Sequence, residues 1–292
     1  MSRSNSLRRA RPLLGTFVEI RVQSDSPAAE AAILAAFAAI ARVERLMSAH
    51  RADSELSRLN AVGHVEAVEV DPWTYDVLAA ALRISGATDG LFDCTVAPAL
   101  ARQGFLPRRL QRAGSGHPSW RDILLLPGRR VRFRRRLALD LGGIAKGFAV
   151  DEAVARLRAA GDFAGAVNAG GDLRVFGPAA EPIHLRDPAE PRRLLRVGSL
   201  KDGAIATSAS YFAARRRNGR RVAPIVDPRR RTVIAASRRS VSVIAADALT
   251  ADALTKPVML EGPGSAEFLA RCGARALILE AGAPPLEIGR AA

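Results

Sequence analysis

The stretches with strand character come in groups along this chain, and they do not alternate one by one with helices. Several of them follow one another between residues 182 and 246 without a helical pattern between them. Parallel strands need a long crossover connection, usually a helix, whereas antiparallel strands need only a short turn. The grouping therefore predicts an α+β fold, in which a mainly antiparallel sheet is flanked by helices.

Apolar spacing and the Gly and Pro residues that interrupt it locate the individual elements. We expect helices over residues 28–47, 72–90, 151–160, 247–262 and 264–273. We expect strands over residues 14–22, as two short strands within 121–140, and over 164–177, where a Gly-Gly pair interrupts the pattern. The chain has 292 residues and no long linker or repeat, so it is long enough to bury a sizeable core.

Positive charge is the strongest global feature of the composition, with a formal net charge of +15. Such a charge first suggests a nucleic-acid partner. The charge comes from runs of arginine, however, since the only lysines are Lys146, Lys201 and Lys256, and aromatic residues make up 5%. This usage is typical of a GC-rich genome, and neither a recognition helix nor a stacking platform is visible. We expect no specific nucleic-acid partner, and favour anionic ligands or acidic protein partners.

The sequence also bears on the compartment. No apolar stretch approaches the roughly 20 residues that span a bilayer, and the basic first residues are not followed by the apolar core of a signal peptide. Cys94 and Cys272 are too few for a disulfide framework or a zinc cluster. We expect a cytoplasmic protein with two reduced thiols and no membrane span.

The stretch ALDLGGIAKG places Asp140, a Gly-Gly pair, Lys146 and Gly147 just ahead of the helix expected from Asp151. Glycine-rich turns let backbone N–H groups point at phosphate oxygens. The stretch therefore fits a phosphate cradle as well as a plain strand-to-helix turn. Neither GxxxxGK[ST] nor GxGxxG occurs, which excludes the common nucleotide-binding motifs. The NAGGD and TSAS segments are further turns of this kind.

The order of these short segments is more specific than any one of them. Along the chain it runs SELSRLN, GLFDCTVAP, DLGGIAKGFAVD, NAGGD, ATSASY, IVDP and ADALTK. This series resembles the FAD:protein FMN transferases, the ApbE-like flavin transferases, over about residues 15–262. The resemblance implies a single domain, here residues 1–292, that holds FAD in a cleft with Mg²⁺ at the diphosphate. The implied reaction moves FMN from FAD to a Thr or Ser hydroxyl of a client protein and releases AMP.

The resemblance also implies roles for individual residues. The metal ion would take the backbone oxygen of Ala145 and the carboxylate of Asp252, with Thr255 as a further candidate ligand. Lys146 would lie at the diphosphate. Lys146, Asp252 and Lys256 are the candidate catalytic residues, because the reaction needs positive charge at the diphosphate and a positioned hydroxyl.

Further residues would line the nucleotide cleft according to the same resemblance. Asp140 is open to two interpretations, since it either contributes to the cleft or only fixes the turn. The candidate FAD-binding residues are His50, Ala145, Lys146, Ala169, Gly170, Gly171, Asp172, Ser208 and Asp227.

The chain departs from the family pattern at the metal site. The family has D-x-x-x-T, whereas here Lys256 stands four residues after Asp252 and Thr255 falls one place early. Positions four apart share a helix face, so a lysine there would bring its ammonium close to the metal position. Either Lys256 takes over part of the metal's role or it is an ordinary surface lysine.

Three more positions depart from the pattern. Pro224 replaces a His that is a plausible proton-transfer group, and a proline cannot transfer a proton. Arg231 replaces the glycine of a D-P-x-T-G turn. His50 stands where relatives have a Tyr over the flavin; an imidazole can stack there and titrates near neutrality, or it is a loop-facing histidine.

Two classes of function are therefore open besides the distant nucleic-acid alternative. The first is a Mg²⁺-dependent transferase that moves FMN from FAD to a client protein. The second is a flavin-binding homologue with lost or weak transferase activity, or an FAD hydrolase. Pro224 and Lys256 are the residues that separate these classes.

Overall fold

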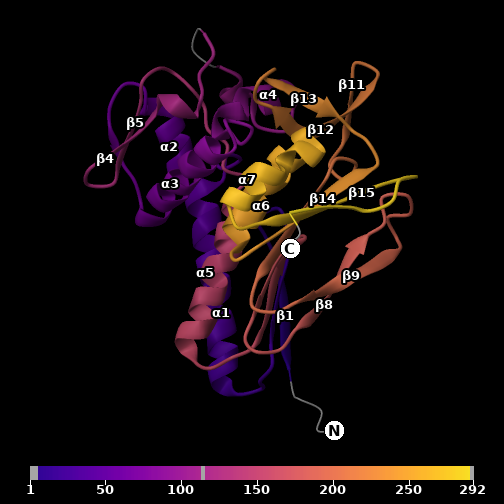
Figure 1. The fold of residues 1–292 in the computed structure, drawn as a ribbon. Helices are drawn as coiled ribbons and strands as arrows, with labels where there is room; N and C mark the ends of the chain where they lie inside the picture. Colours follow the sequence, from indigo (N-terminus) through magenta and orange to yellow (C-terminus); the bar gives the residue numbers. More distant parts are fainter. Residues whose placement is uncertain (1–5, 113–115, 290–292) are drawn as a thin grey trace.

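The computed structural model describes residues 6–112 and 116–289, and its centre is an antiparallel sheet of eight strands (Figure 1). Every pair of neighbouring strands in this sheet is antiparallel, which confirms the predicted α+β class. In spatial order the strands are β1 (Leu7–Leu13), β2 (Thr16–Val22), β6 (Gly165–Ala169), β7 (Asp172–Phe176), β10 (Ala204–Ala209), β14 (Arg239–Ala245), β15 (Arg275–Glu280) and β16 (Leu286–Ile288).

Three helices pack on one another and on this sheet: α1 (Pro27–Met47), α5 (Ala145–Ala160) and α6 (Ala248–Glu261). Figure 1 shows α1 and α5 side by side along the sheet. The alternation of β2 buries Val18 and Ile20 completely, and Ile33 of α1 is equally buried in the same core. Ser26 caps α1 by accepting a hydrogen bond from Ala29 N, so the helix begins within one residue of its predicted start.

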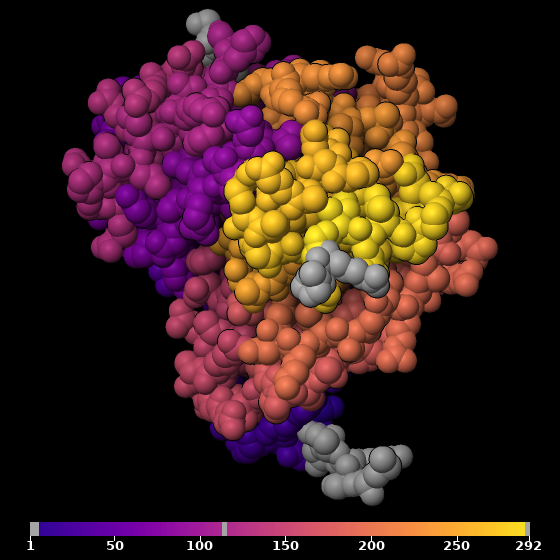
Figure 2. All heavy atoms as spheres, viewed as in Figure 1, coloured from indigo at the N-terminus to yellow at the C-terminus, as the bar shows by residue number. Residues whose placement is uncertain are grey.

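Further helices and three small antiparallel sheets surround this centre. In the space-filling view, the yellow segment with α7 and β15 lies between the purple α2–α3 region and the orange β11–β13 region (Figure 2). These helices are α2 (Glu55–Val62), α3 (Pro72–Ala87), α4 (Ala97–Arg102) and α7 (Ala266–Arg271). The small sheets are β3 (Val68–Glu69), β5 (Arg130–Phe133) and β4 (Ile123–Leu126); β11 (Arg215–Arg217), β12 (Arg220–Asp227) and β13 (Thr232–Ala235); and β8 (Glu181–Arg186) with β9 (Leu194–Leu200). Within the described ranges no helix is long and apolar enough to cross a membrane.

The predicted start of the helix at Asp151 was wrong, because α5 already begins at Ala145. Gly147 therefore lies in the first turn of the helix and not in a loop. A Cβ atom on Gly147 would lie 2.1 Å from the backbone oxygen of Ala248, so this glycine allows α5 to approach the start of α6. Asp151 itself caps α6, since its carboxylate accepts hydrogen bonds from Ala248 N and Leu249 N at 2.9 Å each.

The two short strands predicted within residues 121–140 are confirmed as β4 and β5, but the second ends at Phe133, so the segment before α5 lies outside any strand. No strand lies between Phe133 and α5. Leu137 and Leu139 are nevertheless buried, at most 1% exposed, so the backbone of this segment needs hydrogen-bond partners other than a neighbouring strand. The side chain of Asn60, the last residue of SELSRLN, takes the place of a partner strand. Asn60 accepts from Leu139 N at 2.7 Å and donates to Leu139 O at 3.0 Å, which satisfies the backbone of a buried segment outside any sheet.

Candidate active site

A cavity of about 710 Å³ lies where the end of α1, the start of α5, the middle of α6 and strand β12 meet. Its wall includes the apolar side chains of Leu91, Phe92 and Phe105 and the charged or polar side chains of His50, Asp93, Asp140, Lys146, Arg215 and Lys256. A cavity of this size with mostly apolar walls and a few convergent charges is typical of a small-molecule site. It brings together residues that lie far apart in the sequence.

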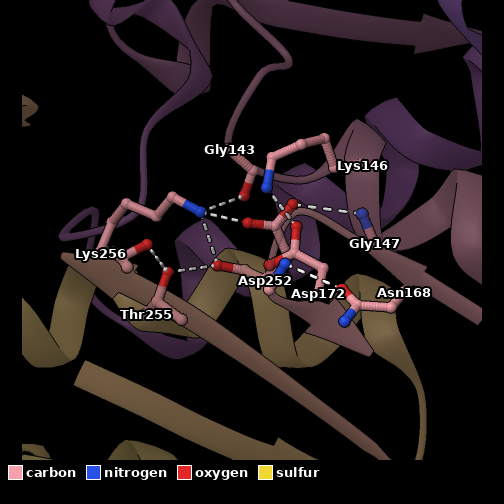
Figure 3. A network of polar contacts seen from close by, with 10 residues as sticks. Gly143, Lys146, Gly147, Asn168, Asp172, Asp252, Thr255 and Lys256 are labelled. Atoms are coloured by element: carbon pink, nitrogen blue, oxygen red, sulfur yellow. Dashed lines mark hydrogen bonds and ion pairs between the residues drawn. The ribbon is translucent and has the colours of Figure 1, made fainter. Parts of the chain in front are cut away.

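Lys256 of α6 lines this cavity and forms an ion pair with Asp252 of the same helix (Figure 3). We call this ion pair the floor of the site. Lys256 Nζ donates to Asp252 Oδ1, to Asp252 O at 2.8 Å and to Gly143 O at 3.1 Å. The second carboxylate oxygen of Asp252 accepts from Gly147 N at 3.2 Å. The side chain of Asp252 is 2% exposed, so this carboxylate is bound on both sides away from water.

A second ion pair lies next to the first and joins α5 to β7 (Figure 3). Lys146 Nζ donates to the carboxylate of Asp172, which is 2% exposed. Lys146 also lines the cavity. The structure therefore brings Lys146, Asp172, Asp252 and Lys256 together in two adjacent ion pairs.

The two pairs shift one another's protonation equilibria. Burial alone would raise the pKa of Asp252, but the ammonium groups of Lys256 and Lys146 bring that pKa below its ordinary value. Burial would lower the pKa of Lys146, and the carboxylates of Asp172 and Asp252 raise it instead. The pKa of Asp172 is raised, mainly by burial and to a smaller extent by repulsion from the Asp252 carboxylate. These pKa shifts arise because the four charges are held close together in a medium of low dielectric constant.

Thr255 and Ser208 lie behind this floor and do not line the cavity. The Thr255 hydroxyl donates to Asp252 O at 2.7 Å and lies 2.8 Å from the Ser208 hydroxyl. Thr255 is fully buried. These hydrogen bonds of Thr255 connect α6 to β10 and hold the backbone of Asp252 in place.

The carbonyl that faces the Lys256 ammonium belongs to Gly143, a residue that sequence reasoning did not single out for this role. Ala145, whose carbonyl was predicted to bind a metal ion, lines the cavity and is 7% exposed, whereas Lys256 Nζ donates to Gly143 O at 3.1 Å. A Cβ atom on Gly143 would lie 3.2 Å from Lys256 Cε. The Gly-Gly pair was the available signal, because a side chain at Gly143 would crowd the lysine.

The residues of the NAGGD turn lie in two different surroundings. Asp172 meets Lys146, whereas Gly170 and Gly171 line a second cavity of about 910 Å³ beside β8. Ala169 is completely buried. Gly170 and Gly171 have φ angles of +62° and +105°, and Gly171 N donates to Asn168 Oδ1 at 2.9 Å. Glycine is favoured here because these φ values strain other residues.

Asp140 and His50 both line the first cavity, opposite Pro224 of β12. Asp140 fixes the turn, since it accepts from Gly142 N at 3.0 Å. Burial raises the pKa of Asp140, and the nearby His50 and Lys256 partly oppose this shift. Asp140 is thus both a turn residue and a cavity residue, so the two interpretations of the sequence combine.

Asp227 caps the turn between β12 and β13. Its carboxylate accepts from Arg229 N at 3.0 Å and pairs with the Arg229 guanidinium. The neighbours Val226 and Pro228 line the cavity, whereas Asp227 does not. Asp227 therefore shapes the cavity wall through the turn.

Arg231 occupies the position of the family's turn glycine with a φ of +53°. Its guanidinium donates to Thr95 O and Thr95 Oγ1 at 3.2 Å each and lies 4.0 Å from Asp93. These contacts compensate for the strained backbone conformation. Asp93, in the GLFDCTVAP segment, is a cavity residue that sequence reasoning missed. Arg231 thus ties the β12–β13 turn to the loop that carries Asp93.

We expect Arg231→Gly to be more stable than Arg231→Ala by about 1 kcal/mol, because both lose the contacts but only glycine relieves the left-handed backbone. The measurement is urea unfolding of both variants. Arg230→Ala is the matched control, since Arg230 is 83% exposed, and we expect it to change the stability by no more than about 0.5 kcal/mol. An alanine variant as stable as the glycine variant would contradict the strain argument.

Comparison with known proteins agrees with this fold. The ApbE family matches residues 14–278. Relatives named FAD:protein FMN transferase include one from Vibrio cholerae, 31% identical over 74% of this chain and 69% of the relative, and one from Treponema pallidum, 30% identical over 87% and 78%. The solved structure of the ApbE protein from Thermotoga maritima is 30% identical and superposes with a TM-score of 0.85 over 98% of this chain and 97% of that one.

The fold is thus that of a flavin-transferase-like α+β protein. The flavinyl transferase ApbE of Pseudomonas stutzeri, 25% identical, superposes with a TM-score of 0.80 over 99% of this chain and 97% of that chain. The chain belongs to the ApbE family.

Proposed function

We propose that this protein is an FAD:protein FMN transferase, which transfers FMN from FAD to a Thr or Ser hydroxyl of a client protein and releases AMP. The observation that carries the proposal is the pair of lysine ammonium groups, Lys146 and Lys256, at one mostly apolar cavity. FAD has two large ring systems joined by a diphosphate, and this cavity offers apolar walls and positive charge together. Relatives with this name align with most of the chain.

The start of α5 would bind the diphosphate. Ala145 and Lys146, in the first turn of α5, line the cavity, and the positive end of a helix dipole favours phosphate. The ammonium of Lys146 adds a formal charge at the same place. The side chains of Phe92 and Phe105 would contact a ring system.

In the proposed reaction the oxygen of the client hydroxyl forms a bond to the phosphorus on the FMN side. The bond from that phosphorus to the bridging oxygen breaks, and AMP leaves with the electron pair. The hydroxyl proton passes to a base at the cavity, for which His50 and Asp140 are available, since Pro224 cannot act. Lys146 and Lys256 would stabilise the charge that develops on the phosphate oxygens.

The family resemblance implies Mg²⁺, and the residues present do not fit an ordinary magnesium site. Among the described residues no group of three or more His, Cys, Asp or Glu side chains is arranged to hold a metal ion. The Asp252 carboxylate, the expected metal ligand, already accepts a hydrogen bond from Lys256, and the same ammonium also donates to Gly143 O. We therefore derive no step through a metal ion. The cytoplasm as compartment, and the lack of a specific nucleic-acid partner, stay predictions.

The test measures binding and turnover of the purified protein. We expect FAD to bind at least about tenfold more tightly than FMN, which is about 1.4 kcal/mol, because the diphosphate and the AMP half contact the cavity. Incubation with FAD and a protein that a curated relative flavinylates should give a covalently fluorescent band and an equal amount of AMP.

Other results would separate the alternatives. Free FMN and AMP without a covalent product would indicate an FAD hydrolase. FAD binding without AMP release would indicate a homologue that has lost the chemistry. Equal affinity for FAD and FMN would contradict the assignment of the cavity to the dinucleotide.

A further inference from the structure

The ammonium of Lys256 is surrounded by oxygen atoms in the way that a bound cation is. Its three oxygen neighbours come from two elements: Asp252 Oδ1 and Asp252 O from α6, and Gly143 O from the turn before α5 (Figure 3). An ammonium group has three donors and no acceptor, so these three oxygens satisfy it completely. The side chain of Lys256 is 22% exposed and lines the cavity.

A divalent ion at these oxygens would need the space that the ammonium fills. Mg²⁺ requires near-octahedral oxygen ligands at roughly 2.0–2.1 Å, so an ion bound to Asp252 and Gly143 would overlap Lys256 Nζ. The remaining oxygen of the Asp252 carboxylate is also in use, since it accepts from Gly147 N at 3.2 Å. The Thr255 hydroxyl donates to Asp252 O at 2.7 Å and does not line the cavity, so it is engaged within the protein and is not directed at a metal ion in the cavity.

The local charges balance without a metal ion. The carboxylates of Asp252 and Asp172 are paired one to one with the ammonium groups of Lys256 and Lys146. An additional divalent ion would bring like charges together in a buried place, which is unfavourable. Lysine, a compact point charge, fits this position better than the arginine used almost everywhere else in the chain.

We propose that the Lys256 ammonium is the resident cation of this site, so that the cavity binds an anionic dinucleotide without a divalent metal ion. The proposal rests on the proposed function in that FAD is the expected ligand. Lys256 holds Gly143 against α6 and places one fixed positive charge beside the diphosphate. A single charge polarises the diphosphate less than a divalent ion does, so slow AMP release accompanies metal-free binding.

The experiment compares FAD affinity in EDTA and in millimolar Mg²⁺, measured by flavin fluorescence. For the unmodified protein we expect the two affinities to agree within about twofold. Lys256→Thr removes the cation and opens its space, so it should lose about tenfold or more in EDTA and regain most of the loss with Mg²⁺. Lys256→Met keeps the length without the charge, so it should lose affinity in EDTA and not be rescued. Lys201→Thr, at an exposed lysine, is the matched control and should resemble the unmodified protein.

A gain of about tenfold or more with Mg²⁺ in the unmodified protein, about 1.4 kcal/mol, would overturn the proposal. The comparison needs no variant, so it decides the matter even if Lys256→Thr fails to fold. Absence of FAD binding in every condition would instead contradict the proposed function. In that case calorimetric titration with MgCl₂ alone still tests the inference: heat of binding in the unmodified protein contradicts it, and binding only in Lys256→Thr supports it.

Discussion

Asp252→Asn should lower the free energy of unfolding by about 3 kcal/mol, because it removes the buried counter-charge of the partly buried Lys256 ammonium. The carboxylate is 2% exposed and is held by Lys256 Nζ on one side and by Gly147 N on the other. Urea unfolding followed by circular dichroism measures the change. We also expect FAD affinity to fall, since the lysine no longer has a fixed position.

Asp202→Asn is the matched control for this change. Asp202 also forms an ion pair, with Arg158, but the two side chains are 54% and 43% exposed. Exposed pairs contribute little, so we expect a change within about 0.5 kcal/mol. An Asp252→Asn variant no less stable than the Asp202→Asn variant would show that the buried pair is not needed for the fold.

Gly147→Ala should destabilise the protein by about 2 kcal/mol or more, although alanine is the better helix former. The added Cβ would lie 2.1 Å from Ala248 O and 2.8 Å from Leu249 Cα. Both are backbone atoms, so the two helices must move apart. The same movement would displace Lys146 from Asp172 and reduce FAD affinity.

Gly86→Ala gives the opposite expectation for the same chemical change. Gly86 lies in α3, and the nearest atom to an added Cβ is Trp120 Cη2 at 3.8 Å, which is ordinary contact. Alanine should therefore stabilise the protein by about 0.5 kcal/mol through helix propensity alone. Thermal and urea unfolding of both variants should give changes of opposite sign. Stabilisation by both would contradict the close approach of α5 and α6.

Local signals predicted most of the elements. Helix α1 was expected over 28–47 and spans Pro27–Met47, and α6 was expected over 247–262 and spans Ala248–Glu261. These helices have apolar residues at helical spacing or side-chain caps, and both signals act within a few residues. The start of α5 was missed because two glycines precede it and a third lies within its first turn. Glycines normally disfavour a helix, and here packing against α6 outweighs that preference.

The candidate site was predicted in part, and the missing part depends on contacts between distant segments. Lys146 and Asp252 were identified through a resemblance, whereas their pairing with Asp172 and Lys256 follows from how α5, β7 and α6 meet. Asp93 was not identified as a cavity residue, because nothing near it in the sequence indicates that Arg231 will contact its loop. Gly143 was not recognised as the carbonyl beside Lys256, because the Gly-Gly pair indicates a close approach to the backbone without telling which distant side chain approaches it.

The cavity wall begins at Leu14 and is completed by Lys256, and this has a consequence for biosynthesis. Contacts between segments so far apart in the sequence form late, because the entropy of closing long loops must be paid first. A nascent chain still attached to the ribosome at β14 lacks the floor of the site, since Asp252 and Lys256 have not yet been added. Flavin can therefore bind only to a chain that already includes α6, and products of premature termination before α6 would not sequester it.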